Sequence, residues 1–187
     1  MKEDQIRYLQ RGRDVLLWKL DGLSEYDARR PMVRTGTNLL GLVKHMAGVE
    51  AGYFGSVFNR PLTDPIPWKT DDADENDEMW ATPGESREFI IDVYRRVWVH
   101  ADETIAALDL NSPGSVPWWP DDRRAVTLDL ILSHVVAEVN RHAGHADILR
   151  ELIDGEVGFR PEAINLTEGF DWDAHRIRLE QAARAAV

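Results

Sequence analysis

The chain has 187 residues and a formal net charge of −11, because 33 Asp and Glu outnumber 22 Lys and Arg. Its 43% apolar content supports a hydrophobic core and excludes a disordered, collagenous or low-complexity protein. The acidic balance, without a long basic cluster, argues against binding to nucleic acids or anionic membranes. The chain has no cysteine, which excludes disulfides, cysteine nucleophiles and thiolate metal sites. With no signal peptide and no membrane-spanning run in the sequence, we expect a cytoplasmic protein.

The spacing of apolar residues is helical almost throughout the chain. It predicts a first helix over about residues 5–20, ending at Asp21-Gly22, where the glycine can adopt a left-handed cap. A second helix is predicted over residues 38–58, capped by Asn38 or by the threonine before it.

The connection from residue 59 to 81 contains three prolines and a dense group of acids. Six acidic residues fall within eight positions: Asp71, Asp72, Asp74, Glu75, Asp77 and Glu78. They lack the regular ligand spacing and the glycine of a calcium-binding loop, so we expect a solvated surface loop.

The third predicted helix has the clearest start. The residues TPGE at 82–85 combine an N-cap, a proline at the first helical position and a capping-box glutamate. This helix should reach about Leu108. A proline-rich connection over 111–125 follows and carries Trp118 and Trp119, which either fill space in the loop or form the wall of a pocket.

The rest of the chain completes a helical fold. A fourth helix is predicted over residues 127–153 and a short last helix over 171–184, and no strand is expected. Four long amphipathic helices without strands predict an all-α four-helix bundle, with a single domain spanning residues 1–187. The long connection between the second and third helices can run along the bundle and permits an up-down-down-up order.

The fourth predicted helix places three histidines and a glutamate on one face. At about 100° per residue, Glu138, His142 and His145 lie about 40°, 80° and 20° from His134. Apolar residues lie on or beside this face, so it should point toward the core. A buried carboxylate is costly without a partner, and a divalent cation is one such partner.

The spacing of these residues suits a metal ion. Glu138 and His142 are four residues apart, which lets both side chains reach one ion. His45 is the best third ligand because it lies mid-helix beside an apolar face. Two imidazoles and one carboxylate suit zinc, nickel or iron(II), and three protein ligands leave a position open for a further ligand. The alternative is a buried polar network without metal, in which Glu138 pairs with Arg141 or with a histidine.

Three segments together resemble a known superfamily. The first helix ends near LDGLSEYDARRP, the second carries NLLGLVKHMAGVE, and the fourth carries LSHVVAEVNRHAGHADILRELIDG. With the tail FDWDAHRIRLEQAARA, they resemble the DinB-like superfamily, also called YfiT-like metal-dependent hydrolases, and its actinobacterial branch of mini-circle-type proteins. The fourth-helix motif is similar to that of the N-terminal domain of mycothiol-dependent maleylpyruvate isomerase.

The resemblance implies a four-helix bundle with a long crossover between the second and third helices, and a divalent metal held by three residues. Carried over onto this sequence, the ligands are His45, Glu138 and His142, with zinc as the first expectation and nickel or iron as others. Many relatives have a histidine at the position of Glu138. His134 and His145 lie outside this set, and we expect them to orient the ligands or to line the pocket.

Characterised relatives are thiol transferases that use mycothiol, bacillithiol or glutathione. The resemblance therefore implies an S-transferase of detoxification or stress response, in which a metal-activated thiol attacks a small electrophile. Substrate should enter between the connections at 59–81 and 110–126. Two alternatives stay open: a hydrolase whose metal activates water, and a non-catalytic metal-binding or structural stress protein. A homodimer formed through an apolar helix face is a further hypothesis.

Overall fold

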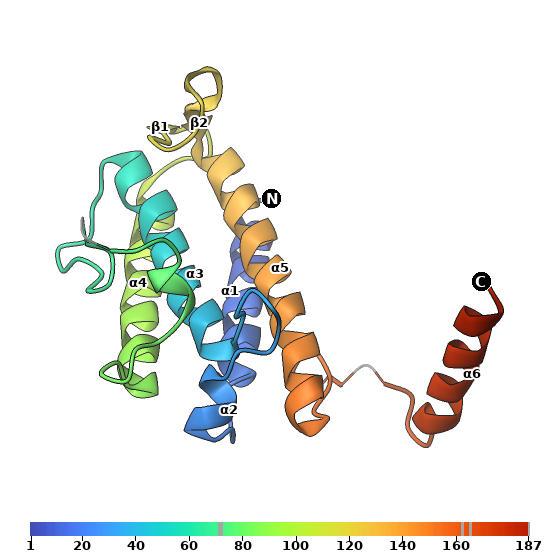
Figure 1. The fold of residues 1–187 in the computed structure, drawn as a ribbon. Coiled ribbons are helices and arrows are strands. Elements are labelled where there is room, and N and C mark those ends of the chain that lie inside the picture. The colour runs from blue at the N-terminus through green and yellow to red at the C-terminus, as the bar shows by residue number, and fades with distance from the viewer. Residues whose placement is uncertain (71–72, 162, 165, 187) are drawn as a thin grey trace. The chain divides into compact units, whose positions relative to one another are not determined.

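The computed structural model describes residues 1–70, 73–161, 163–164 and 166–186. The chain divides into two compact units, residues 1–157 and 158–187. The described part of the chain is mostly helical, which confirms the predicted all-α class (Figure 1). The α-helices are α1 Lys2–Trp18, α2 Glu25–Arg29, α3 Leu39–Phe54, α4 Arg87–Ala107, α5 Leu128–Asp154 and α6 Trp172–Ala185.

A small hairpin corrects the expectation that the chain has no strands. The strands β1 (Pro113–Ser115) and β2 (Ala125–Thr127) pair antiparallel. The hairpin lies at the end of the first unit where α3 ends and α5 begins (Figure 1). Its loop carries Trp118 and Trp119, whose rings pack against Tyr53 on α3.

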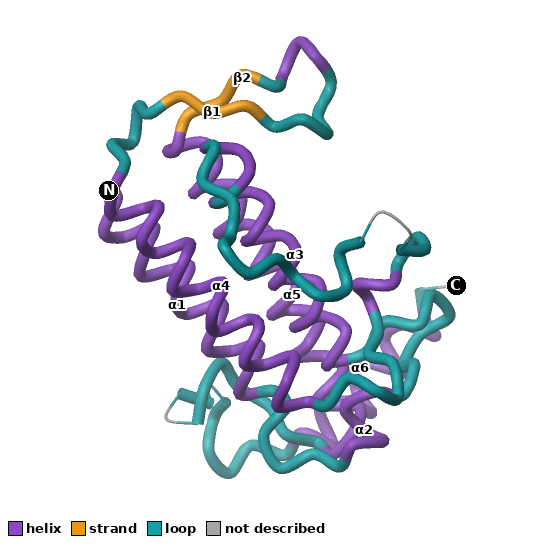
Figure 2. The backbone as a smooth tube through the Cα atoms, turned by 90° about the vertical axis from the view of Figure 1, so that its left-hand side faces the viewer, coloured by secondary structure: helices purple, strands orange, loops and turns teal. Residues whose placement is uncertain are grey.

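Helix α3 is the central element of the first unit. It packs against both α4 and α5, while α1 packs against α5 (Figure 2). Because α3 is covered on several sides, most of its side chains are buried. Asn38 caps it as predicted, since its side chain accepts a hydrogen bond from the Gly41 N–H at 2.8 Å. The predicted end of this helix is corrected, because α3 stops at Phe54 and a separate 3₁₀ turn covers Ser56–Phe58.

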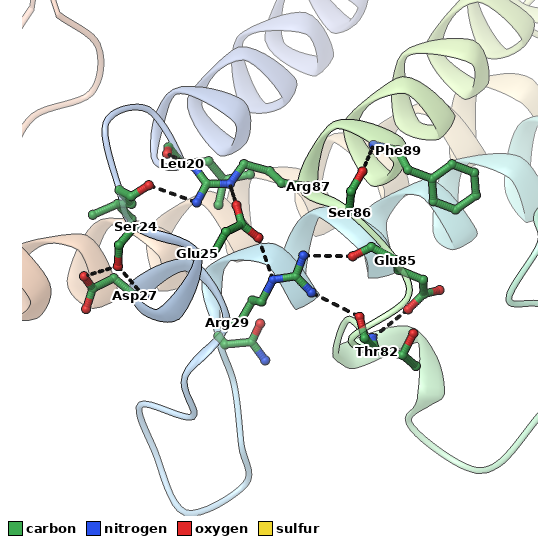
Figure 3. A network of polar contacts seen from close by, with 12 residues as sticks. Leu20, Ser24, Glu25, Asp27, Arg29, Thr82, Glu85, Ser86, Arg87 and Phe89 are labelled. Carbon is green, nitrogen blue, oxygen red and sulfur yellow. Dashed lines mark hydrogen bonds and ion pairs between the residues drawn. The ribbon is translucent and has the colours of Figure 1, made fainter.

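The predicted start of the third helix at Thr82 is wrong, although the expected capping-box hydrogen bond is present. The Glu85 carboxylate accepts from the Thr82 N–H at 2.7 Å, but α4 begins only at Arg87. The Ser86 hydroxyl caps it by accepting from the first turn of the helix. Arg29 of α2 donates to the carbonyls of Thr82 and Glu85, which joins α2 to the start of α4 (Figure 3).

Glu85 also connects the start of α4 to α3. Its carboxylate accepts a hydrogen bond from the Lys44 ammonium at 2.9 Å, and buried Lys44 donates as well to the Trp80 carbonyl. Burial alone would raise the pKa of Glu85, but hydrogen bonds from Thr82 and Lys44 outweigh it and lower the pKa. The carboxylate therefore stays charged and serves as the anionic partner of a buried ammonium.

Replacing Glu85 with Gln is expected to lower the free energy of unfolding by about 1–2 kcal/mol near neutral pH, because buried Lys44 loses its charged partner. A carboxyl whose pKa is lowered by folding contributes stability above its ordinary pKa of 4.5 and loses it as the pH falls through the folded-state value. The difference between wild type and variant should therefore shrink as the pH falls below 4.5. Urea unfolding at neutral and acidic pH measures it, and a difference of equal size at both would contradict this interpretation.

The second unit contains α6, which confirms the predicted last helix. Asp171 caps α6 by accepting from the Ala174 N–H at 2.8 Å, and the rings of Phe170 and Trp172 pack with their centroids 4.6 Å apart. The expected single domain over the whole chain stays a prediction. Among the residues that the structure describes, no helix combines the length and the apolar character needed to cross a bilayer.

Candidate metal centre and its pocket

Helices α3 and α5 bring the three predicted metal ligands together. The ring centroids of His45 on α3 and His142 on α5 are 4.9 Å apart, across the interface of the two helices. Glu138 lies one helical turn before His142, and its Oε2 is 3.6 Å from His142 Nε2. The contact is local on α5, but the approach of His45 depends on how the two helices pack.

His142 is buried and has one ring nitrogen without a partner. Its Nδ1 atom is buried and makes no hydrogen bond to any residue that the structure describes. Burial lowers the pKa of His142 to about 4, and the charges of His45, His145 and Arg141 act in the same direction. The imidazole is therefore neutral near neutral pH, which is the form that can donate a lone pair to a metal.

His45 is oriented by a carboxylate that the sequence analysis did not single out. Its Nδ1 lies 2.8 Å from Glu78 Oε1. The hydrogen bond with His45 lowers the pKa of Glu78 and outweighs the effect of burial. An ionised carboxylate can only accept, so Nδ1 carries the proton, and in the neutral form of the ring Nε2 of His45 keeps its lone pair. This is the arrangement by which an acidic residue fixes the tautomer of a metal-binding histidine.

The prediction of a solvated acidic loop is thus wrong at Glu78. Asp74 and Glu75 of the same group are exposed, whereas the Glu78 side chain is 30% exposed and faces His45. Asp71 and Asp72 lie outside the described residues. The sequence could not separate Glu78 from its acidic neighbours, since only the path of the loop decides which of them reaches α3.

Two glycines of α3 explain how the loop approaches so closely. A Cβ atom at Gly41 would overlap the carbonyl oxygen of Met79, and one at Gly48 would lie 2.9 Å from Glu78 Oε2. A side chain at position 41 would therefore push the backbone of the loop away from the helix, whereas one at position 48 would displace the Glu78 carboxylate. The 3₁₀ turn Asp77–Met79 therefore packs directly on α3 and delivers Glu78 to His45.

A cavity of about 370 Å³ opens beside these residues, and its walls include His45, Tyr53, Lys69, Trp118, His134 and Glu138. Lys69 belongs to the connection before α4 and Trp118 to the hairpin loop, so both connections expected to flank substrate entry contribute to the wall. His134 lies in the wall with its ring edge-on to Tyr53, 4.7 Å between centroids. His145 is exposed, contrary to the expectation that this face of the helix points inward, and its ring centroid lies 5.4 Å from that of His142.

Among the described residues, no three His, Asp or Glu side chains are arranged to hold a metal ion as they stand. The chemistry of the donors nevertheless fits a divalent cation. His142 has a buried nitrogen without a partner, His45 has a free Nε2, and Glu138 supplies a carboxylate beside them. Two neutral imidazoles and one carboxylate suit a cation of intermediate softness such as Zn²⁺.

Comparison with protein families confirms the resemblance to the DinB-like superfamily. Within that class, the model of the mycothiol-S-transferase family matches residues 5–155, and the chain belongs to this family. The match extends from α1 to the end of α5 and includes all five residues that the sequence analysis assigned to the site. A comparison with curated proteins finds no match.

Proposed function

We propose that this protein is a divalent-metal-dependent S-transferase that joins a low-molecular-weight thiol, of the mycothiol type, to small electrophiles. Membership of the mycothiol-S-transferase family supports the thiol and the transfer. The observation that carries the metal is the approach of the His45 and His142 rings to 4.9 Å beside Glu138, at the wall of a cavity. Detoxification or a stress response is the role that fits this chemistry.

In this proposal, His45, Glu138 and His142 hold the ion, with zinc first and nickel or iron as alternatives. A bound cation of this kind lowers the pKa of a thiol, so that the thiolate is available at neutral pH. The chain has no cysteine, so the nucleophilic sulfur has to arrive with a co-substrate. Lys69 adds a half-exposed side chain to the cavity wall, with its ammonium 3.8 Å from Glu78 Oε2.

Two assays test the proposal against its alternatives. Zinc-loaded protein is mixed with mycothiol and chlorodinitrobenzene, and separately with an ester substrate without thiol. We expect conjugation in the first assay, loss of conjugation after chelation, and its return when zinc is added back. Ester cleavage without conjugation would replace the proposal with a metal-dependent hydrolase. Full metal occupancy with neither reaction would indicate a non-catalytic metal-binding protein.

Glu78→Ala is expected to weaken zinc binding by about 10–100-fold, the usual cost of removing the carboxylate that orients a ligating histidine. Zinc titration in competition with a chromogenic chelator measures the affinity. Glu75→Ala is the matched control, since Glu75 is exposed in the same acidic loop. Equal affinities for the two variants would remove Glu78 from the metal centre.

We also infer that the four long helices form a bundle in the up-down-down-up order, with the crossover between α3 and α4. The pairs of residues in contact support this order. Between α1 and α5, and between α3 and α4, later residues of one helix contact later residues of the other, as in parallel helices. Between α3 and α5, later residues contact earlier ones, as in antiparallel helices. The contacts are Gln5–Asp129, Lys19–Asp147, Lys44–Glu85, Glu50–Tyr94, His45–His142 and Tyr53–His134.

A cytoplasmic location and a homodimer stay predictions. Sedimentation analysis of the purified chain tests the second directly. A monomer over the whole concentration range would contradict the homodimer and leave the proposed chemistry unaffected, because the site is built from one chain.

A further inference from the structure

The cavity at the candidate metal centre has two ends of different chemistry. Its wall on α3 runs from His45 to Tyr53, eight residues apart and therefore about 12 Å along the helix axis. The end at His45 also contains Glu138. The other end, called the far end below, is formed by Tyr53, His134 and Trp118.

The far end carries polar groups that the protein itself does not use. The indole N–H groups of Trp118 and Trp119 donate to Tyr53 Oη, at 3.4 and 3.1 Å. They occupy the two lone pairs of the phenol oxygen, whose proton has no acceptor among the described residues. The ring of His134 lies edge-on to those of Tyr53 and Trp119, and neither of its nitrogens is hydrogen-bonded within the described part of the chain. One hydroxyl donor and two imidazole nitrogens are therefore available to a ligand.

Trp118 adds a fixed aromatic surface to the far end. A Cβ atom at Gly52 would lie 3.1 Å from Trp118 Cη2, so this edge of the indole is closed against α3. Together with the hydrogen bond to Tyr53, this contact holds the ring in place. Trp118 is nevertheless 52% exposed and lines the cavity, which leaves the rest of its ring open to a ligand.

Among the described residues that line the cavity, no lysine, arginine or carboxylate belongs to the far end. Lys69 lies beside Gly48, whose carbonyl accepts from its ammonium at 3.4 Å, and 3.8 Å from Glu78 Oε2. An anionic group placed at the far end would lose its water without gaining a cationic partner from these side chains. A neutral group with hydroxyls, in contrast, can use the phenol proton and the imidazole nitrogens.

We propose that the far end binds a neutral, hydroxyl-bearing ring of the thiol, and that Tyr53, His134 and Trp118 thereby determine which thiol is used. The C–H groups of a saturated ring pack favourably on the negative face of an indole, and its hydroxyls can accept from Tyr53 and pair with His134. Mycothiol carries a sugar and a cyclitol, whereas glutathione carries carboxylates in their place. This assignment rests on the proposed function, which puts the thiol sulfur at the His45 end.

Calorimetric titration of the metal-free protein with two unreactive thioethers, S-methyl mycothiol and S-methylglutathione, tests the selection. We expect S-methyl mycothiol to bind at least about tenfold more tightly. Trp118→Leu should weaken its binding by about five- to tenfold and leave that of S-methylglutathione unchanged. Trp80→Leu is the matched control, since Trp80 is 46% exposed and lines a different cavity. The control should bind both thioethers as the wild type does.

A second variant tests the polar part of the far end. His134→Phe keeps a ring against Tyr53 and Trp119 but removes both nitrogens. It should weaken the binding of S-methyl mycothiol by about fivefold, as expected for the loss of one hydrogen bond. Equal affinity for the two thioethers in the wild type, or wild-type binding of S-methyl mycothiol by both Trp118→Leu and His134→Phe, would overturn the proposal.

Steady-state kinetics separate this subsite from the proposed function. Trp118→Leu should raise the KM for mycothiol and leave the KM for chlorodinitrobenzene unchanged. A raised KM for chlorodinitrobenzene alone would place the electrophile at the far end and overturn the proposal. If Trp118→Leu weakens the binding of S-methyl mycothiol and no electrophile is conjugated, the subsite stands and the transferase function is wrong. If this variant conjugates electrophiles with the wild-type KM for mycothiol, the function stands and the subsite is wrong.

Discussion

His142→Ala is expected to abolish stoichiometric zinc binding and to lower kcat/KM for thiol conjugation by about a hundredfold or more. His142 is the buried member of the predicted ligand set, and its low pKa keeps it neutral where zinc binds. No other histidine on α5 is both buried and within 4.9 Å of the ring of His45. Elemental analysis of the purified variant, together with the conjugation assay, measures both effects.

The matched control for this prediction is His175→Ala, which removes an imidazole from α6 in the second unit. Zinc content and activity should stay at the wild-type level in the control. Circular dichroism of both variants checks that the helices are intact. Equal zinc content in His142→Ala and wild type would exclude His142 as a ligand.

Glu50→Ala is expected to lower the free energy of unfolding of the first unit by about 3–5 kcal/mol. Glu50 and Arg13 are both fully buried, and Arg13 Nη2 lies 2.6 Å from Glu50 Oε2. Burial alone would lower the pKa of Arg13, but the carboxylates of Glu50 and Asp102 outweigh it and raise the pKa. Removing Glu50 therefore leaves a buried charge without its main partner, and the Tyr94 hydroxyl loses its acceptor.

Asp102→Ala provides the comparison, because Asp102 pairs with the same arginine but is 52% exposed. This variant should cost at most about 1 kcal/mol, as expected for a partly solvated ion pair. Urea unfolding, analysed with the same m-value for both variants, gives the two losses in free energy of unfolding. Similar, small losses in the two variants would show that the buried pair contributes little to the stability of the first unit.

Much of the fold was predictable because it follows from local patterns. Helical spacing located the four long helices, and Asn38 and Asp171 cap their helices as the sequence indicated. The start of α4 was missed because two caps compete within five residues. Glu85 forms the capping-box bond yet is held by Lys44, so Ser86 takes over as the N-cap. The hairpin was missed because each of its strands has only three residues.

The candidate site likewise combines local features, which were predictable, with contacts between distant segments, which were not. The proximity of Glu138 to His142 was predictable because a four-residue spacing on one helix is a local property, and the approach of His45 was expected from its place on an apolar face. Their role as metal ligands stays a prediction. Glu78 was not predictable, since it reaches His45 across 33 residues of sequence. Tyr53 likewise accepts hydrogen bonds from two indole N–H groups only because the hairpin loop brings Trp118 and Trp119 to α3. Contacts between separate elements depend on how those elements pack, as where glycine positions on α3 let the turn at 77–79 approach the helix. The periodicity of apolar residues does not reveal such close approaches.

The central claim is that α3 and α5 together hold one divalent cation with a position left for a thiol. Titration of Co²⁺ into the metal-free protein, followed by its visible absorption, tests this most directly. We expect saturation at one equivalent per chain, loss of the signal in both His45→Ala and His142→Ala, and a further spectral change when mycothiol is added. Absence of saturable binding, or binding that is unchanged in both variants, would contradict the account.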